Sequence, residues 1–352
     1  MNTAVRLFLL TLCVCSVALA AQVYTKTAPA QSWESIRRIP FQGMADLVSV
    51  HPEEPGFLFA GTGGSLYASS DEGKHWKQVL HLGAKAKINA FYFEQEKTFL
   101  LTSEGLYESP DRGASWKKIF GGSQTKEQNA LSLKQSPIHS NTFYLGTDGG
   151  LFTSADSGRT WQKETSELGR LAVSAIESDA ENRELFVATG KGLYRMRPDR
   201  NRIERVYASR SALSEEVSFE TDVADEFDFE LTPSNEIQRI VIASQWNPMI
   251  AIATQKGVYV SDDEGNHWER LSLSGLLNTE VLDLVYWPKE HSLIAGTKRG
   301  IYRYDRAGKR WKELTSGFPL IRTNRLALAH DEVNILYAAT SEGLYRITLA
   351  PE

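Results

Sequence analysis

The sequence predicts an all-β fold built from repeated units, on three observations. A short motif, Ser-x-Asp-x-Gly-x-x-Trp, recurs down the chain at a nearly fixed interval. Each copy follows a β-rich stretch that ends in an aromatic residue, and the runs between turns alternate as strands do, without a convincing amphipathic helix. A segment near the N-terminus also matches the one strand that the last unit lacks. Self-similarity at a period of about 20 to 50 residues marks solenoids, propellers or arrays.

The aromatic residue before the motif measures the repeat. It occurs in seven units, at Tyr67, Tyr107, Phe152, Tyr194, Tyr259, Tyr302 and Tyr345. Subtracting neighbouring positions gives steps of 40, 45, 42, 65, 43 and 43 residues. One step is long and the others lie near 43, so we expect seven units with one insertion.

Four units carry the complete motif. Its members are Ser69, Asp71, Gly73 and Trp76; Ser109, Asp111, Gly113 and Trp116; Ser154, Asp156, Gly158 and Trp161; and Ser261, Asp263, Gly265 and Trp268. The fourth unit has Ile203 in place of Trp, and the sixth has Arg306 in place of Asp. Because the spacing of these two units holds, we expect their strands to persist with a different turn.

The seventh unit ends one strand short, and the missing strand lies at the other end of the chain. Residues 33–36, which begin with Trp33, match residues 76–79, and Trp33 precedes Trp76 by the same 43 residues. A strand contributed by the N-terminus closes a ring and removes an exposed sheet edge. The sequence therefore predicts a closed seven-bladed β-propeller of four-stranded antiparallel blades over residues 33–350.

Each unit is expected to contain four strands. In the first unit these are residues 47–50 as the inner strand, 57–60, 66–69, and 76–79 as the outer strand. The motif falls between the third and fourth strands and suits a tight turn, because Asp and Ser accept hydrogen bonds from backbone amides and Gly adopts a positive φ. The Trp adds a large apolar surface, whose indole N–H needs a partner when buried.

The run from Ser69 to Trp76 resembles the Asp-box, also called the BNR repeat. This motif occurs in sialidases, sortilin-type receptors, xyloglucanases and the photosystem II stability and assembly factors, so it is shared by enzymes and binders. The resemblance covers nearly the whole chain after the first 32 residues. Its organisation is most similar to the assembly factors, which implies a single exported propeller that binds a protein partner without catalysing a reaction.

Residues 1–20 have the three parts of a secretory signal peptide: an early Arg6, an apolar run over residues 7–17 and a small-residue ending. We therefore expect a periplasmic or secreted protein, with residues 21–32 as a linker. Both cysteines, Cys13 and Cys15, fall inside this segment. The mature protein is then expected to contain neither disulfides nor thiolate-bound metal.

The insertion, at about residues 209–236, is strongly acidic. It contains no basic residue after Ser211 and nine acidic ones: Glu215, Glu216, Glu220, Asp222, Asp225, Glu226, Asp228, Glu230 and Glu236. One interpretation is a solvated loop. The other is a docking segment, because Phe219, Phe227, Phe229 and Leu231 lie among the charges and long loops in compact domains are often functional.

Basic residues are expected on the same rim of the ring as this insertion, at hairpin turns and in the loops between units. The candidate binding residues are Arg38, Arg170, Lys191, Arg239, Lys256, Lys298, Arg299, Arg322 and Arg325. Such a rim suits an acidic peptide or an anionic glycan. Export, a net charge of −5 and the lack of interleaved aromatic residues argue against nucleic acid.

One segment supports an enzymatic alternative. Arg38-Ile39-Pro40 resembles the Arg-Ile-Pro signature of sialidases, in which an arginine cluster binds a carboxylate through the guanidinium fork. Arg239 and Arg325 are the residues that could join Arg38 near a central cavity. The alternative interpretation is that Arg38 and Pro40 simply end the closing strand.

No catalytic residue, metal ligand or cofactor site is assigned from the sequence. The chain contains no His-Glu-x-x-His or Gly-x-Ser-x-Gly motif, and its Gly-Thr-containing segments recur as hairpin turns. We therefore expect a non-enzymatic exported scaffold that assists assembly or quality control of an envelope or membrane protein complex. Glycan binding, or glycoside hydrolysis of the sialidase type, is the alternative.

Overall fold

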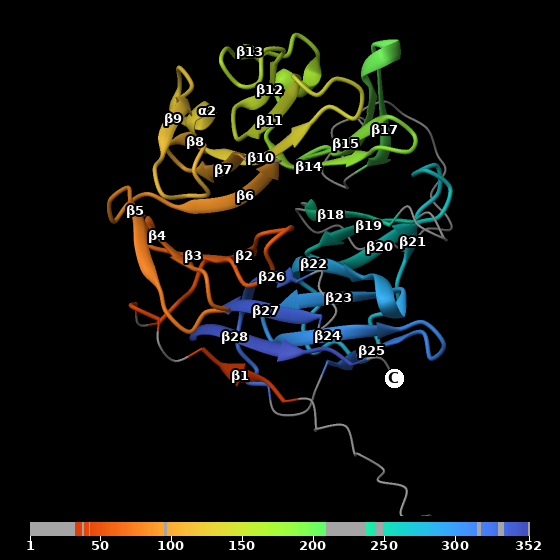
Figure 1. Cartoon of the computed structure of the whole chain (residues 1–352). Coiled ribbons are helices and arrows are strands. Elements are labelled where there is room, and N and C mark those ends of the chain that lie inside the picture. Colours follow the sequence, from red (N-terminus) through yellow and green to blue (C-terminus); the bar gives the residue numbers. More distant parts are fainter. Residues whose placement is uncertain are drawn as a thin grey trace, which may run out of the picture. The chain divides into compact units, whose positions relative to one another are not determined.

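The predicted ring of seven sheets is present. A computed structural model describes residues 32–36, 39–41, 43–94, 97–208, 237–243, 249–314, 318–329 and 334–350. Over these ranges the chain forms seven four-stranded antiparallel sheets, here called blades 1 to 7 (Figure 1). The predicted signal peptide, the acidic insertion and Arg38 lie outside the described residues.

Each blade runs from an inner strand through second and third strands to an outer strand. Blade 1 contains β2 (Leu47–Val50), β3 (Leu58–Thr62), β4 (Ser65–Ser69) and β5 (Lys77–His81). Blade 2 contains β6 (Ile88–Glu94), β7 (Lys97–Thr102), β8 (Gly105–Ser109) and β9 (Lys117–Phe120). Blade 3 contains β10 (Ala130–Gln135), β11 (Phe143–Thr147), β12 (Gly150–Ser154) and β13 (Gln162–Lys163). Blade 4 contains β14 (Val173–Asp179), β15 (Glu184–Thr189), β16 (Gly192–Arg197) and β17 (Arg202–Ala208).

The remaining blades follow the same order. Blade 5 contains β18 (Ile237–Ala243), β19 (Met249–Thr254), β20 (Gly257–Ser261) and β21 (Glu269–Arg270). Blade 6 contains β22 (Val281–Trp287), β23 (Ser292–Thr297), β24 (Gly300–Asp305) and β25 (Arg310–Glu313). Blade 7 contains β26 (Thr323–Leu328), β27 (Ile335–Thr340), β28 (Gly343–Thr348) and β1 (Glu34–Ser35). Helical structure in the described part is short: α2 (Thr125–Gln128), η1 (Glu167–Gly169), η2 (Pro198–Arg200) and η3 (Pro288–Glu290).

The N-terminal strand closes the ring as predicted. β1 pairs antiparallel with β28, so that Glu34 lies opposite Arg346 and Ser35 opposite Tyr345. The side chains reinforce this pairing, with Arg346 Nε 3.1 Å from Glu34 Oε2. Trp33 lies just before the strand and packs against Phe318, with ring centroids 4.6 Å apart.

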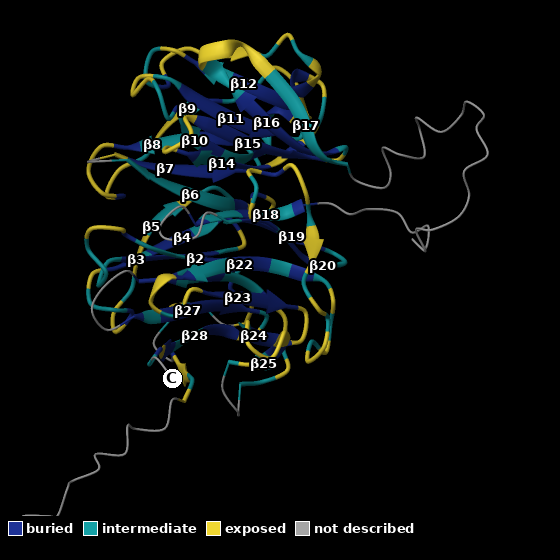
Figure 2. Cartoon of the chain, turned by 90° about the vertical axis from the view of Figure 1, so that its right-hand side faces the viewer, coloured by how far each residue is buried: buried dark blue, intermediate teal, exposed yellow. Residues whose placement is uncertain are grey.

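Packing between neighbouring blades forms the core. Each of the seven interfaces has its own cluster of buried apolar side chains, and the cluster between blades 7 and 1 completes the circle. Buried residues concentrate in the second strands, such as β15 and β23 (Figure 2). The outer strands β13 and β21 are exposed. The ring therefore buries apolar surface on both sides of every blade, which drives closure.

The repeated motif forms the turn between the third and outer strands, where the sequence places it. In blade 1 the Ser69 hydroxyl donates to Asp71 Oδ1 at 2.9 Å and accepts from the Gly73 N–H at 2.9 Å. The Trp76 indole N–H donates to the Gly73 carbonyl at 3.0 Å. The same Ser–Asp and Ser–Gly bonds recur in blades 2, 3 and 5, so one local sequence builds four nearly identical turns.

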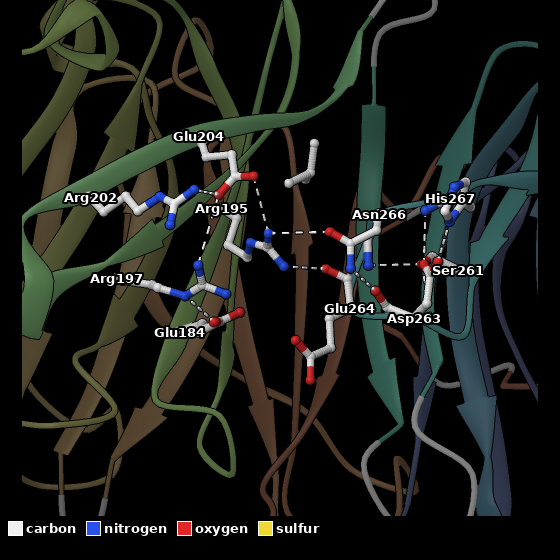
Figure 3. A network of polar contacts seen from close by, with 12 residues as sticks. Glu184, Arg195, Arg197, Arg202, Glu204, Ser261, Asp263, Glu264, Asn266 and His267 are labelled. Carbon is white, nitrogen blue, oxygen red and sulfur yellow. Dashed lines mark hydrogen bonds and ion pairs between the residues drawn. The ribbon is translucent and has the colours of Figure 1, made fainter.

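Blade 4 lacks the motif and carries a charged network instead (Figure 3). Arg195, which is buried, lies 3.3 Å from Glu204 and donates to the carbonyl of Glu264 in the motif turn of blade 5 at 2.9 Å. Arg197 pairs with Glu184 on the adjacent strand. The hydrogen bond to Glu264 ties β16 to blade 5, and the two ion pairs join β16 to its neighbouring strands within blade 4.

Chain order assigns every connection to one of two faces. Inner strands begin on the face that we call the upper face, together with the turns between second and third strands and the connections between blades. The motif turns lie on the opposite, lower face. The structure thus separates the repeated staples from the rim that the sequence predicts for binding.

Candidate functional site: the central channel

The inner strands surround a central channel. Six of them, β6, β10, β14, β18, β22 and β26, line a cavity of about 910 Å³. An adjoining hollow of about 400 Å³ is lined in addition by β2. Arg239, Arg325 and Lys134 line both spaces.

One inner-strand position distinguishes blades 5 to 7 from the others. We call it the third position. Each second strand ends in a threonine, and the third position pairs with the residue before that threonine, as Arg239 pairs with Ala253 in blade 5. In blades 1 to 4 it holds Leu47, Ala90, Ser132 and Ala175. In blades 5 to 7 it holds Arg239, Asp283 and Arg325, which we call the charged arc.

The charged arc contains two cations and one anion. Arg239 Nε lies 2.8 Å from Asp283 Oδ1, and Arg325 Nη1 lies 3.6 Å from the same oxygen. The Asp283 side chain is fully buried, at 0% exposure, whereas Arg325 is 21% and Arg239 36% exposed. The arc therefore carries a net charge of +1, and its cationic part is the part that reaches the channel.

Hydrogen bonds hold the arc in place. The other carboxylate oxygen of Asp283 accepts a hydrogen bond from the Leu326 N–H at 2.7 Å, which links blade 6 to blade 7. Arg325 Nη2 donates to the Asn89 carbonyl at 3.1 Å, which reaches past blade 1 to blade 2. Burial, and the neighbouring Arg239 guanidinium after it, lower the pKa of Arg325 to about 10. Arg325 is thus still charged at neutral pH.

A second layer of the channel is balanced in charge. Two positions further along the inner strands, blades 2 to 4 place Tyr92, Lys134 and Glu177, whereas blades 5 to 7 place Val241, Val285 and Ala327. Lys134 Nζ lies 2.6 Å from Glu177 Oε1 and 5.6 Å from the centre of the Tyr92 ring. Burial raises the pKa of Tyr92 to about 12, so the phenol stays neutral. The excess positive charge of these two layers therefore lies in the charged arc.

The structure brings together two of the predicted rim residues, Arg239 and Arg325. Arg170 lies exposed beside η1, and Arg322 lies on the connection before β26, where its Nε donates to Asn324 at 2.8 Å. Four others occupy upper-face turns: Lys191, Lys256, Lys298 and Arg299. Lys298 is paired with Glu280 at 2.5 Å. The prediction for Arg38 stays a prediction, because Arg38 lies outside the described residues.

Asp283 was not among the residues predicted from the sequence, although its position in the repeat indicates it. Asp283 follows Arg239 by 44 residues and precedes Arg325 by 42, which is one repeat in each direction. Aligning the units by their third position would have placed the three residues side by side. Asn89 was not predicted either, since it contributes through its backbone carbonyl and leaves no side-chain signal.

Two further findings concern the described residues. Within the ranges that the structure describes, no group of three or more His, Cys, Asp or Glu side chains is placed to hold a metal ion. In the same part of the chain, no helix is both long and apolar enough to cross a membrane.

No protein-family model matches the chain. No curated protein matches it in sequence. Among solved structures, it is similar to the extracellular domain of a putative one-component system from B. thetaiotaomicron, with a TM-score of 0.67 and 12% identity over 91% of this chain and 40% of that one. It is also similar to YCF48 bound to D1 peptide, with a TM-score of 0.63 and 14% identity over 92% of this chain and 99% of that one. A third similar structure is an ancestral GH74 enzyme, with a TM-score of 0.62 and 14% identity over 90% of this chain and 46% of that one.

These likenesses show the fold, a seven-bladed β-propeller, and no more. The chain spans less than half the length of two of the three proteins. They include a peptide-bound propeller and an enzyme, and a fold of this kind hosts both. Function must therefore be argued from the channel.

Proposed function

We propose that this protein is an exported, non-enzymatic scaffold that binds an acidic segment of a protein partner at the upper mouth of its channel. The partner belongs to an envelope or membrane protein complex that the scaffold helps to assemble or to check. The observation that carries the proposal is the charged arc, in which two guanidinium groups of the channel share one buried carboxylate.

The electrostatics of the arc favour an anionic ligand. The Arg239 and Arg325 guanidinium groups compete for a single oxygen of Asp283, at 2.8 and 3.6 Å. A ligand carboxylate would supply the missing negative charge and would accept the guanidinium N–H groups that Asp283 leaves unused. A partly buried site strengthens such pairing, since water screens it less than it screens surface charges.

The positions of the carboxylates support binding rather than hydrolysis. A glycosidase needs two carboxyl groups flanking the substrate, one as acid and one as nucleophile or base. Asp283 is buried behind the two arginines, and Glu177, which lines the cavity, is paired with Lys134. Burial raises the pKa of Glu94, which suits an acid, but Glu94 accepts from Gln135 and does not line the cavity.

Glycan binding or hydrolysis is the second candidate, and one observation favours it. Two arginines face one cavity that is also lined by Tyr92, Tyr286 and Glu177, residue types found in the sites of carboxylate-bearing sugars. The GH74 enzyme shows that a similar fold occurs with glycosidase activity. This candidate predicts turnover of a sialoside or a β-glucan, which the scaffold does not.

Similar proteins lend support at the level of the fold. YCF48 is seen with a peptide, so a propeller of this kind can bind a polypeptide segment. Extracellular domains among the similar structures agree with export. A binding surface on the upper face does not involve the motif turns, which lie on the lower face.

The test is affinity capture from the native envelope fraction with a matched pair of variants. The first, Arg239→Gln/Asp283→Asn/Arg325→Gln, neutralises the arc, while the amide oxygen introduced at position 283 remains an acceptor for the Leu326 N–H. The second, Lys134→Gln/Glu177→Gln, removes an equally close pair without changing the net charge. We expect the native protein and the second variant to recover the same partner, and the arc variant to lose at least about tenfold. Recovery of the same partner by the arc variant, or hydrolysis of a sialoside or β-glucan by a native protein that captures nothing, would contradict the proposal.

A further inference from the structure

Exposed large apolar side chains are few on the described surface, and all of them lie in one kind of position. They are Met44, Leu277 and Leu320, at 48%, 53% and 49% exposure. Each lies in the connection that leads into an inner strand: Met44 before β2, Leu277 before β22 and Leu320 before β26. Since inner strands begin on the upper face, the three side chains share that face with the charged arc.

These residues also share one side of the ring. They belong to the connections of blades 1, 6 and 7, which are consecutive around the closed ring. Blades 6 and 7 supply Asp283 and Arg325 to the charged arc, so the apolar residues continue outward from the same inner strands. In blade 4 the corresponding connection buries its Leu168 side chain, at 0% exposure. We call Met44, Leu277 and Leu320 the apolar arc.

Positive charge accompanies the apolar arc. Arg299, on the turn between β23 and β24, and Arg322, before β26, are both exposed on this side of the upper face. The exposed Glu342, on the turn between β27 and β28, lies on the same side. Apolar side chains beside Arg299, Arg322 and the charged arc, whose net charge is +1, complement a chain that carries both carboxylates and apolar side chains. In blades 6 and 7 the charged arc and the apolar arc therefore belong to the same inner strands and the connections that lead into them.

We propose that the bound partner segment joins an acidic stretch to an apolar one, and that it leaves the channel over blades 6, 7 and 1. The acidic residues meet Arg239 and Arg325, and the apolar residues cover Met44, Leu277 and Leu320. This inference rests on the proposed function and adds to it the composition and the direction of the bound segment. Apolar contact supplies affinity, while the carboxylates fix the register.

The test uses two labelled peptides in a fluorescence anisotropy titration. The first joins a block of glutamates through serines to a block of leucines, and the second has serines in place of the leucines. The apolar-arc variant is Met44→Ser/Leu277→Ser/Leu320→Ser. Its matched control, Ala84→Ser/Thr125→Ser/Thr165→Ser, changes exposed residues in the connections before the inner strands of blades 2, 3 and 4.

We expect the native protein to bind the leucine-containing peptide more tightly, and the apolar-arc variant to lose about tenfold in affinity for that peptide alone. The control variant should bind both peptides as the native protein does. All the substitutions are at exposed sites, so melting temperatures should change little.

The possible failures are distinct. If the native protein binds neither peptide, the proposed function fails. If it binds both peptides equally and the apolar-arc variant behaves as the native protein, the proposed function stands and this inference is overturned. Binding to vesicles of anionic phospholipid that the apolar-arc variant loses, without preference between the peptides, would also overturn it and assign the surface to a membrane.

Discussion

The two faces of the ring differ in how closely the blades resemble one another. On the lower face, blades 1, 2, 3 and 5 build one turn with nearly the same hydrogen-bond lengths. On the upper face, the third position of the inner strand is small or apolar in blades 1 to 4 and charged in blades 5 to 7. The repeated turns stabilise the four blades that carry the motif. The charged arc breaks the symmetry, and a binding site requires a place that differs from its equivalents.

Ser132 and Asp283 make the comparison concrete. They occupy the third position in blades 3 and 6. Each accepts a hydrogen bond from the backbone N–H of the residue that follows the third position in the next blade: Ile176 at 2.8 Å for Ser132, and Leu326 at 2.7 Å for Asp283. Asp283 adds a charge to this shared bond and holds two arginines. The structural task is common to both residues, and the electrostatic task belongs to Asp283.

The largest effect is expected from Asp283→Ala. The substitution leaves two arginines facing each other without a counter-charge and also removes the acceptor of the Leu326 N–H. Removing one partner of a buried ion pair costs about 3–5 kcal/mol of unfolding free energy. Ser132→Ala leaves the Ile176 N–H without its acceptor and also removes the long hydrogen bond, 3.4 Å, from the Ser132 hydroxyl to the Ile176 carbonyl, but it removes no charge and should cost about 1–2 kcal/mol. Urea denaturation of both variants checks the order, and equal losses would remove the electrostatic distinction between the two positions.

The next effect concerns the lower face, where two glycines of the repeated turn differ in their surroundings. Gly113 and Gly158 have φ values of +85° and +86°, so alanine is strained at both. A Cβ on Gly113 would also lie 2.6 Å from the buried Phe59 ring, whereas on Gly158 the nearest atom is Ile119 Cδ1 at 3.2 Å. We expect Gly113→Ala to cost about 3 kcal/mol and Gly158→Ala about 1 kcal/mol. Thermal unfolding measures both; a larger loss for Gly158→Ala would contradict the packing described for this turn.

The turns of the lower face could be predicted from the sequence more completely than the charged arc of the upper face, for a physical reason. The motif from Ser69 to Trp76 forms its hydrogen bonds within eight residues, so local chemistry determines it. The match of Trp33 to Trp76 predicted ring closure because a propeller reuses the same strand in each blade. Arg239 and Arg325 were identified singly, but their convergence on Asp283 depends on pairing register and on contacts between residues about 40 apart.

Two features could not be predicted from the sequence because they depend on contacts between residues far apart in the chain. One is the charged network of blade 4, in which Arg195 donates to the Glu264 carbonyl. In the sequence its residues look like ordinary surface charges.

The other feature concerns the motif tryptophans. Their indole N–H groups were expected to find partners, and those of Trp76, Trp161 and Trp268 do. The buried indole N–H of Trp116 has none among the described residues, although its motif is identical.

Acid should weaken the motif turns of the lower face. Hydrogen bonds from the Thr160 hydroxyl and backbone lower the pKa of Asp156 to about 2, and those from the His267 backbone and ring lower the pKa of Asp263 to about 2. A depressed folded-state pKa contributes stability that is fully present above the unfolded value, 3.8, and is lost as the pH falls towards 2. Melting temperatures measured from pH 5 to pH 2 should therefore fall less steeply in Asp156→Asn. An unchanged slope would show that this turn does not contribute.

The smallest effect is expected at the rim. Lys256 lies on an upper-face turn, and its backbone N–H, which Lys256→Ala retains, donates to Thr254 Oγ1 at 3.0 Å. The substitution should change the unfolding free energy by less than about 0.5 kcal/mol. Any loss of affinity for an acidic peptide should be under about twofold and should vanish at high salt. Titrations at two salt concentrations test this, and a salt-independent loss would place Lys256 inside the binding site.

The most direct test of the central claim is a calorimetric titration of a glutamate-block peptide into three proteins. These are the native protein, the neutral-arc variant Arg239→Gln/Asp283→Asn/Arg325→Gln, and the channel control Lys134→Gln/Glu177→Gln. If the net positive charge of the arc binds the partner, the native protein and the control bind with similar, salt-sensitive affinity, and the neutral-arc variant loses at least about tenfold. Equal affinity in a neutral-arc variant that melts as the native protein does would contradict the account.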